Sequence, residues 1–300
     1  MSALFGGIEG GGTKFVCVIG TGPDDIRAHE TFPTTSPEET LGAAADFFAR
    51  RHADSSIAAL GIGCFGPLDL DPASATYGAI TTTPKPGWSG VNFAHYFAAR
   101  LGVPIGWETD VNAAALAEQR WGAARGLDTL VYITVGTGIG GGALVRGRPL
   151  HGLVHPEMGH IPLTPFMGTV GAGVCPYHGG GCLEGVASGP ALAARAGRPA
   201  EDLAEDDPIW DDEARYLAFG AAVATLMLSP QRIIIGGGVL KQAHLYPRIR
   251  AHFTALLAGY VRSPALGQGA TSYIVPPQLG DRAGALGALA LAQDTAPAAP

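Results

Sequence analysis

Four side chains of the types that bind metal ions lie close together in the middle of the chain. Cys175, His178 and Cys182 have the spacing C-x2-H-x3-C, and His160 lies fifteen residues before the first cysteine. Two thiolates and two imidazoles form a tetrahedral ligand set of the kind that zinc prefers. The alternative is two unrelated buried cysteines with unconnected histidines, but the tight spacing and the glycines in between favour a bound metal. His155 is the nearest substitute ligand; otherwise it and His151 are interpreted as ordinary surface or loop residues.

Three acidic residues have positions that suit chemistry at a polar site. Glu157 and Glu184 flank the four ligands, so the metal is expected to tie a loop that keeps such a site in shape. Asp110 stands at the junction of an expected strand and an expected helix. There it is either the N-cap of the helix or a general base that takes the proton of a hydroxyl accepting a phosphoryl group.

Glycine-rich turns occur at residues 9–14, 136–141 and 236–238. The second turn matches G-x-G-x-x-G, and Glu157 lies near the distance expected for a ribose-binding acid, but a strand and a tight turn follow instead of a crossover helix. The first turn departs from a P-loop because Thr13 precedes Lys14 and a strand follows. A plain hairpin is the better interpretation of one such turn alone. Two of matching design, with Lys14 and a third turn, favour backbone N–H groups that bind phosphate.

The composition is that of a well-buried α/β protein that does not bind polyanions. The chain has 300 residues, of which 47% are hydrophobic and 45 are glycine, so two subdomains are expected. Its net charge of −7, from 19 basic and 26 acidic residues, disfavours nucleic acid as a partner. No long uncharged apolar segment and no export signal are evident, and a soluble protein of the reducing cytoplasm is expected, with Cys17 and Cys64 as buried apolar side chains.

The first two glycine-rich turns are each expected to join the two strands of a β-hairpin. Apolar runs at Ala3–Ile8 and Phe15–Ile19 predict the first hairpin, and those at Leu130–Val135 and 141–145 predict a second one about 125 residues later. Two hairpins of the same plan suggest an internal duplication. Further elements are expected at the following places: helices at Pro37–His52 (N-cap Ser36), Asn92–Leu101 and from about Val111, and strands at Ile57–Cys64, Pro104–Glu108 and Arg232–Ile235.

Five motifs in the same order resemble the ROK family of sugar kinases, repressors and open reading frames. They are G-G-G-T-K, D-V-N-A-A-A-L-A-E, V-G-T-G-I-G-G-G, P-E-M-G-H and the Cys/His cluster ending in C-L-E-G, and they run from about residue 6 to 292. The resemblance implies a duplicated, actin-like (ribonuclease H-like) α/β fold whose two subdomains have a cleft between them. The segments C-P-Y-H-G, G-I-E-G-G-G-T-K-F and A-S-G-P look most like the bacterial zinc-containing fructokinases, which more often have two residues, not three, between the histidine and the last cysteine.

The resemblance also implies roles for individual residues. Asp110 would be the catalytic base and a sugar contact, and Glu157, His160 and Glu184 would bind the sugar. His160 would also be a zinc ligand, with Cys175, His178 and Cys182. The residues that would border ATP, used with Mg2+, are Gly11, Gly12, Thr13, Lys14, Thr137, Gly138, Pro190, Gly236, Gly237, Gly238, Val239 and Leu240.

The function expected from these motifs is ATP-dependent phosphorylation of a hexose, D-fructose first, by a homodimer. Mannose, glucose and N-acetylmannosamine are the alternative substrates. A sugar-responsive repressor is disfavoured by the charge and by the five residues before the first hairpin, and an inactive sugar-binding protein by Asp110 and the intact turns. The expected organisation is a small subdomain of residues 1–115 plus 281–293, a large one of residues 116–280 and a frayed tail at 294–300.

Overall fold

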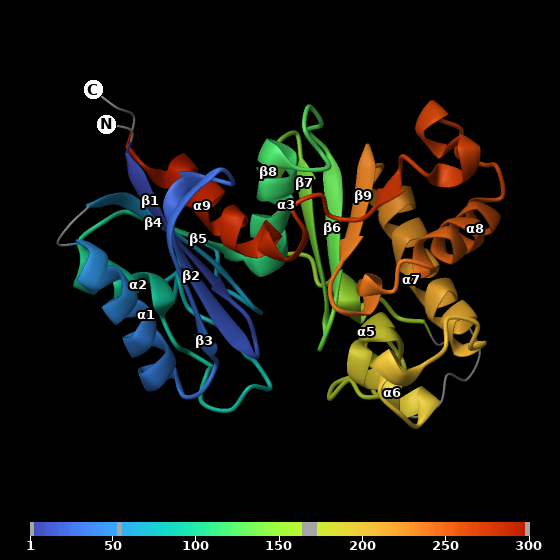
Figure 1. Ribbon diagram of the computed structural model, residues 1–300, viewed down its shortest axis with the longest axis horizontal. Helices are drawn as coiled ribbons and strands as arrows, with labels where there is room; N and C mark the ends of the chain where they lie inside the picture. The colour runs from blue at the N-terminus through green and yellow to red at the C-terminus, as the bar shows by residue number, and fades with distance from the viewer. Residues whose placement is uncertain (1–2, 53–55, 164–172, 298–300) are drawn as a thin grey trace. The chain divides into compact units, whose positions relative to one another are not determined.

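The computed structural model describes residues 3–52, 56–163 and 173–297. The chain divides into two compact α/β units (Figure 1). The first comprises Met1–Arg125, Pro149–His155 and Asp281–Pro300, and the second comprises Gly126–Arg148 and Pro156–Gly280. The return of residues 149–155 to the first unit is not expected from the sequence. None of the helices in the described ranges has the length and apolar character needed to cross a membrane.

The first unit is built on a five-stranded sheet of order β3-β2-β1-β4-β5. β1 pairs with β2 as an antiparallel hairpin and with β4 in parallel, and β4 pairs in parallel with β5. Its strands are Leu4–Gly10 (β1), Lys14–Gly22 (β2), Asp25–Pro33 (β3), Ile57–Cys64 (β4) and Ile105–Thr109 (β5).

The second unit repeats this plan with a sheet of order β10-β9-β6-β7-β8. β6 pairs with β7 as an antiparallel hairpin and with β9 in parallel, as β1 pairs with β2 and β4. Its strands are Leu130–Val135 (β6), Ile139–Val145 (β7), Arg148–Pro149 (β8), Arg232–Gly236 (β9) and Ile274–Val275 (β10). Read from its other edge, the second sheet therefore has the strand plan of the first, and the predicted duplicated, actin-like fold is confirmed.

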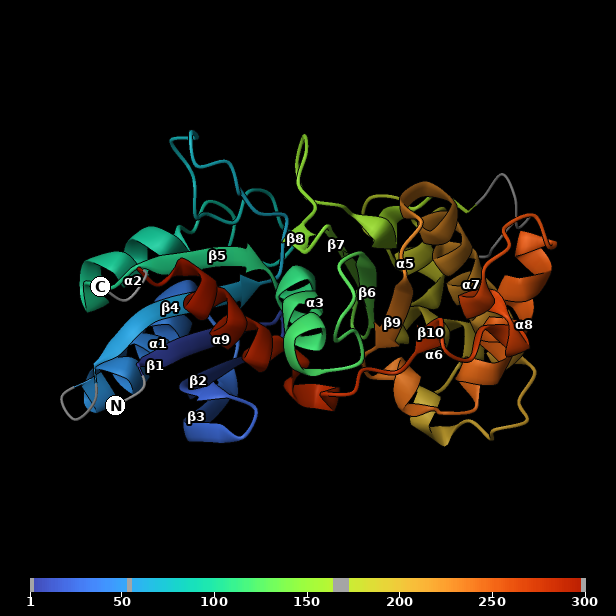
Figure 2. The same ribbon diagram turned by 90° about the horizontal axis from the view of Figure 1, so that it is seen from above.

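Helices cover both faces of the first sheet (Figures 1 and 2). A Cβ atom at Gly6 would lie 2.9 Å from Phe48 of helix α1, whereas one at Gly7 would lie 3.1 Å from Ala288 of helix α9. Because neighbouring strand residues point to opposite faces, α1 and α9 cover opposite sides of β1. The helices of this unit are Pro37–His52 (α1), Phe93–Leu101 (α2), Asp110–Trp121 (α3) and Ala283–Thr295 (α9).

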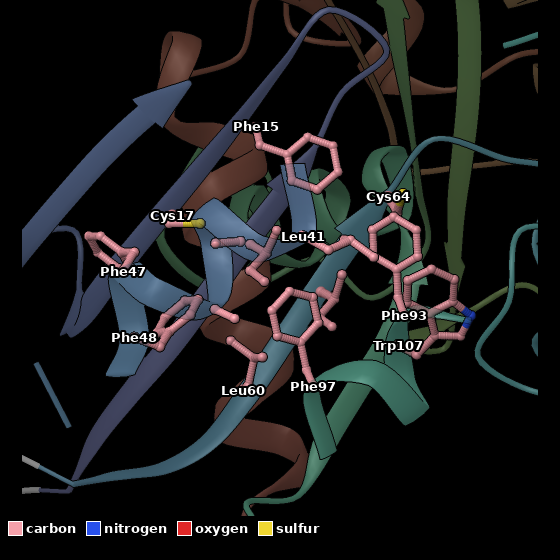
Figure 3. Close-up of a cluster of buried hydrophobic side chains, with 14 of the residues drawn as sticks. Phe15, Cys17, Leu41, Phe47, Phe48, Leu60, Cys64, Phe93, Phe97 and Trp107 are labelled. Carbon is pink, nitrogen blue, oxygen red and sulfur yellow. The ribbon is translucent and has the colours of Figure 1, made fainter. Parts of the chain in front are cut away.

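The core on the α1 and α2 side is rich in aromatic rings (Figure 3). Phe15, Phe47, Phe93 and Phe97 are completely buried, and the predicted burial of Cys17 and Cys64 is confirmed. On the opposite face of the sheet, small residues let the backbone of α9 lie close to the backbone of the strands. A Cβ at Gly61 of β4 would lie only 2.0 Å from the Ala288 carbonyl oxygen of α9.

The second unit contains two long packed helices and several short ones. The helices are Leu183–Ala187 (α5), Gly189–Ala196 (α6), Ile209–Leu228 (α7) and Leu245–Leu257 (α8), with 3-10 turns at Met158–His160 (η1), Ala200–Asp202 (η2), Val239–Lys241 (η3), Pro264–Leu266 (η4) and Gln268–Ala270 (η5); a further 3-10 turn at Gly280–Arg282 (η6) leads into α9.

Candidate functional site

Asp110 is the first residue of α3, directly after strand β5. The helix cap is its neighbour Thr109, whose hydroxyl accepts from the Asn112 N–H at 3.2 Å. Asp110 instead accepts from the Val111 N–H through Oδ1 at 2.8 Å. Of the two interpretations of Asp110, the N-cap is therefore wrong, and the carboxyl group stays available at the carboxyl end of the strand.

A second acid, Glu9 at the end of β1, interacts with Asp110 and was missed by the sequence analysis. Burial raises the pKa of Asp110 to about 6. Burial and then the charge of Asp110 raise the pKa of Glu9 to about 7, while Lys14 acts in the opposite direction. Its place directly before the first glycine turn was the signal that could have singled it out. The two carboxyl groups therefore titrate near neutral pH.

The first glycine turn joins β1 to β2. The Gly11 N–H donates to the Lys14 carbonyl at 2.9 Å, and Lys85 donates to the Gly12 carbonyl at 2.7 Å. A Cβ atom at Gly12 would meet nothing within 4 Å, and its φ is outside the left-handed region. Neither packing nor backbone conformation therefore requires glycine at position 12, which leaves close approach of a ligand as a reason for it.

The four predicted metal ligands converge in the second unit. The ligand atoms of His160, Cys175, His178 and Cys182 all lie within 4.8 Å of one another. His160 Nδ1 is 3.8 Å from Cys175 Sγ and 3.7 Å from Cys182 Sγ, and His178 Nδ1 is 3.6 Å from Cys175 Sγ. A tetrahedral zinc ion with ordinary Zn–S and Zn–N bonds would set sulfur and nitrogen about 3.5 Å apart. The donor set thus fits zinc in both chemistry and spacing.

The three glycines between His178 and Cys182 are absorbed by two tight turns. The Gly179 N–H donates to the Cys175 carbonyl, and the Gly181 N–H donates to the His178 carbonyl, both at 2.8 Å. Gly179 has a φ of +54°, which glycine adopts without strain. The longer spacing therefore leaves the ligand set intact. Part of the predicted metal-bound loop, residues 164–172, lies outside the described residues.

Glu184, in the first turn of α5, holds the second glycine turn. Its Oε2 accepts from the Ile139 N–H at 2.9 Å, and a Cβ at Gly138 would lie 2.6 Å from the same oxygen. A side chain at Gly138 would therefore displace the Glu184 carboxylate that holds this turn. Glu157 is exposed directly before η1, the turn that carries His160.

A pocket of about 760 Å³ in the second unit collects part of the predicted ATP-binding set. Thr137, Pro190, Gly238 and Val239 line it, whereas Gly138, Gly236, Gly237 and Leu240 are not among its lining residues. Ten other lining residues were not expected from the sequence: Gly136 and Gly189 lie inside recognised motifs but were not assigned to ATP, and the other eight come from segments without a recognisable motif. The ten residues are Gly136, Gly189, Ala193, Arg198, Pro199, Ala200, Glu201, Trp210, Lys241 and Gln242.

The three glycines of the third turn have different reasons to be glycine. A Cβ at Gly236 would press on Pro277, and Gly237 has a φ of +96° with the Val135 backbone beside it. Gly238 has nothing within 4 Å of a Cβ position and faces the pocket. Gly136, in the second turn, is equally open and also lines the pocket. Within the pocket, Gly136 and Gly238 are therefore the positions where glycine leaves room for a ligand.

The two histidines interpreted as ordinary surface or loop residues have specific contacts. His155 is only 5% exposed, and its Nε2 accepts from the Leu68 N–H at 2.9 Å. His151 Nε2 lies 2.7 Å from Glu108 Oε2. The surface interpretation is wrong for His155, and neither histidine belongs to the metal cluster.

Comparison with known proteins agrees with this architecture. The model of the ROK family matches residues 5–295. The fructokinase of Zymomonas mobilis is 44% identical over 96% of this chain and 96% of its own, and that of Streptococcus mutans is 42% identical over 99% of both. The ROK hexokinase structure from Thermus thermophilus has a TM-score of 0.77 at 29% identity, covering 97% of this chain and 98% of its own.

A Streptomyces griseus ROK family glucokinase, solved with glucose and AMPPNP, has a TM-score of 0.74 at 26% identity and covers 97% of this chain and 100% of its own. The match to the family model and the identity to curated relatives extend over almost the whole chain. The chain belongs to the ROK family.

Proposed function

We propose that this protein transfers the γ-phosphoryl group of ATP to D-fructose and releases ADP and fructose 6-phosphate. The observation that carries the proposal is the identity of 41–44% to several curated fructokinases over almost the full length of both chains. The glucokinases among the curated relatives are more distant, at 29% identity.

Asp110 is the general base in this proposal. The 6-hydroxyl of the sugar gives its proton to the carboxylate while its oxygen forms the new bond to phosphorus and the bond to the ADP oxygen breaks. A pKa of about 6 keeps the carboxyl group mostly ionised at neutral pH, yet basic enough to take the proton. Glu157, His160 and Glu184 bind the sugar hydroxyls.

The co-substrate is ATP with Mg2+, which would neutralise part of the charge of the phosphates. The adenosine portion occupies the pocket lined by Thr137, Pro190 and Gly238. The backbone N–H groups of the glycine turns bind the phosphates.

Zinc, held by His160, Cys175, His178 and Cys182, supports the loop without joining the chemistry. Four protein ligands complete its tetrahedron and leave no position for water or substrate. The Leu183 N–H donates to the Ile161 carbonyl at 3.1 Å, so the two limbs of the loop are joined directly beside the ligands His160 and Cys182. A zinc ion bound by these four residues would keep His160, and Glu157 three residues before it, oriented for the sugar.

The decisive test is a coupled assay of kcat/KM for fructose, mannose, glucose and N-acetylmannosamine with the same ATP and Mg2+. Fructose should have the highest value, because a hydroxyl in the wrong orientation leaves buried polar groups unpaired and costs orders of magnitude. A tenfold preference for glucose or N-acetylmannosamine would overturn the fructokinase assignment, although the protein would still be a sugar kinase.

We also propose that the enzyme is a cytoplasmic homodimer. Light scattering should then give about twice the chain mass of 30.6 kDa.

A further inference from the structure

The segment between β8 and η1 is attached to the first unit at two histidines. Residues 149–155 belong to the first unit, and the chain enters the second unit at Pro156, one residue before Glu157. The side chains of His151 and His155 connect this segment to Glu108 and to the backbone of Leu68, respectively. Leu153, which lies between the two histidines, is fully exposed. The attachment therefore falls immediately before a proposed sugar ligand.

The contact made by His155 is buried and rigidly supported. Its Nε2 accepts the Leu68 N–H at 2.9 Å, and a Cβ at Gly66 would lie 3.1 Å from its ring. Leu68 is 2% exposed, belongs to the aromatic core of the first unit and pairs with Ile80. The imidazole is thus fixed to backbone that cannot move without disturbing the core.

The contact made by His151 reaches the strand end that carries the catalytic base. Glu108 is 2% exposed, and its Oε1 accepts from the Thr109 N–H at 2.8 Å and from Asn112 Nδ2 at 3.0 Å. Its Oε2 lies 2.7 Å from His151 Nε2. This hydrogen bond with Glu108 raises the pKa of His151. Glu108 thus accepts from Thr109, Asn112 and His151, and it lies two residues before Asp110 in the sequence.

We propose that His155, assisted by His151, is a positioning residue that sets where Glu157 meets the sugar. The inference rests on the proposed function, because it takes Glu157 as a sugar ligand. Glu157 lies two residues after His155, so its Cα can lie no more than about 7 Å from that of the anchored histidine. Loss of the anchor releases the chain on the N-terminal side of Glu157, whose carbonyl still accepts from the His160 N–H at 3.0 Å, and does not touch the pocket lined by Gly136 and Gly238.

The kinetic test compares His155→Ala with His155→Gln. Glutamine can place its amide oxygen near the Nε2 position and accept from Leu68, whereas alanine leaves that buried N–H without its partner. His155→Ala should raise the KM for fructose by about tenfold or more, with the KM for ATP within twofold, and His155→Gln should recover most of the loss. The exposed His95→Ala is the surface control.

Loss of stability alone would give a different result. Phe97→Leu lowers the stability of the same core, so it should lower the melting temperature without selectively raising the KM for fructose. The proposal is overturned if His155→Ala raises both KM values alike, or if His155→Gln is as poor as His155→Ala.

Hydrogen exchange tests the anchor without any activity. The amides of residues 150–155, of Glu157 and of Leu68 should exchange faster in His155→Ala than in the wild type, and at near wild-type rates in His155→Gln. If the exchange rates of these amides were unchanged in His155→Ala, the anchoring role of His155 would be overturned. A wild type that exchanges as expected but does not phosphorylate fructose instead disproves the proposed function.

Discussion

At the scale of single residues, Asp110 is a carboxyl group that helix capping does not use, since Thr109 caps α3. Asp110→Asn should keep the fold and sugar binding but lower kcat by about 10² to 10⁴, the usual contribution of a positioned base. The wild-type rate should also fall as the pH drops through about 6, because protonation of Asp110 removes the base. Steady-state kinetics with circular dichroism as the folding control decide this. If the variant kept most of its turnover, Asp110 would not be the general base, and Glu157 would be the next candidate.

Glu9 should make stability depend on pH in a direction unusual for an acid. Its pKa is raised to about 7 in the folded protein, above the ordinary 4.5, so the fold favours the protonated form. This contribution is complete below the unfolded pKa and is lost as the pH rises through about 7. Glu9→Gln should therefore raise the melting temperature more at pH 8.5 than at pH 5.5, measured without nucleotide. An equal change at both pH values would contradict the raised pKa.

At the scale of elements, the glycine turns separate into positions that the fold needs and positions that it does not. Gly12→Val and Gly238→Val should raise the KM for ATP by about tenfold or more by blocking phosphate or nucleotide, while the melting temperature changes little. Gly138 is a poor probe, since a side chain there would strike Glu184. Gly42→Ala in α1, where a Cβ also meets nothing, is the matched control. A rise in the KM for fructose equal to that for ATP would count against phosphate binding.

The metal-bound loop should contain one zinc ion per chain, and Cys182→Ser should remove most of it. Without the ion, proteolysis within residues 173–184 should become faster and the KM for fructose should rise, because His160 loses its orientation. Elemental analysis of purified protein is the direct measurement. Folded, active enzyme with almost no zinc would disprove the assignment.

The sequence predicts elements well where one local pattern determines them. The apolar run Leu130–Val135 became β6 with the expected ends, and the four candidate metal ligands, which do converge, were recognised because three of them lie within eight residues. β3 was missed because this edge strand is mostly polar and pairs only with β2. The partners of His151 and His155 are 43 and 87 residues away, so no local spacing could reveal them.

At the scale of the whole molecule, the seam between α9 and the first sheet links distant parts of the chain. A Cβ atom at Gly61 of β4 would lie 2.0 Å from the Ala288 carbonyl oxygen of α9, and one at Gly287 of α9 would lie 2.0 Å from the Ala113 carbonyl oxygen of α3. Gly61→Ala should therefore destabilise the protein by about 1–3 kcal/mol through overpacking. Gly42→Ala should be neutral or stabilising, as alanine is the better helix former. Thermal unfolding of both variants tests the seam, and a neutral Gly61→Ala would contradict its tight packing.

The position of α9 also sets an order of events during synthesis. The ribosome makes β1, β2 and β4 early, but the helix that covers one face of these strands comes only after the whole second unit. The second unit, by contrast, is complete by Gly280. Although N-terminal domains generally fold first on the ribosome, the part of the first sheet that α9 covers stays exposed in the nascent protein until α9 emerges. Chaperones that shield exposed strands would therefore act on the beginning of this chain for almost the entire time of its translation.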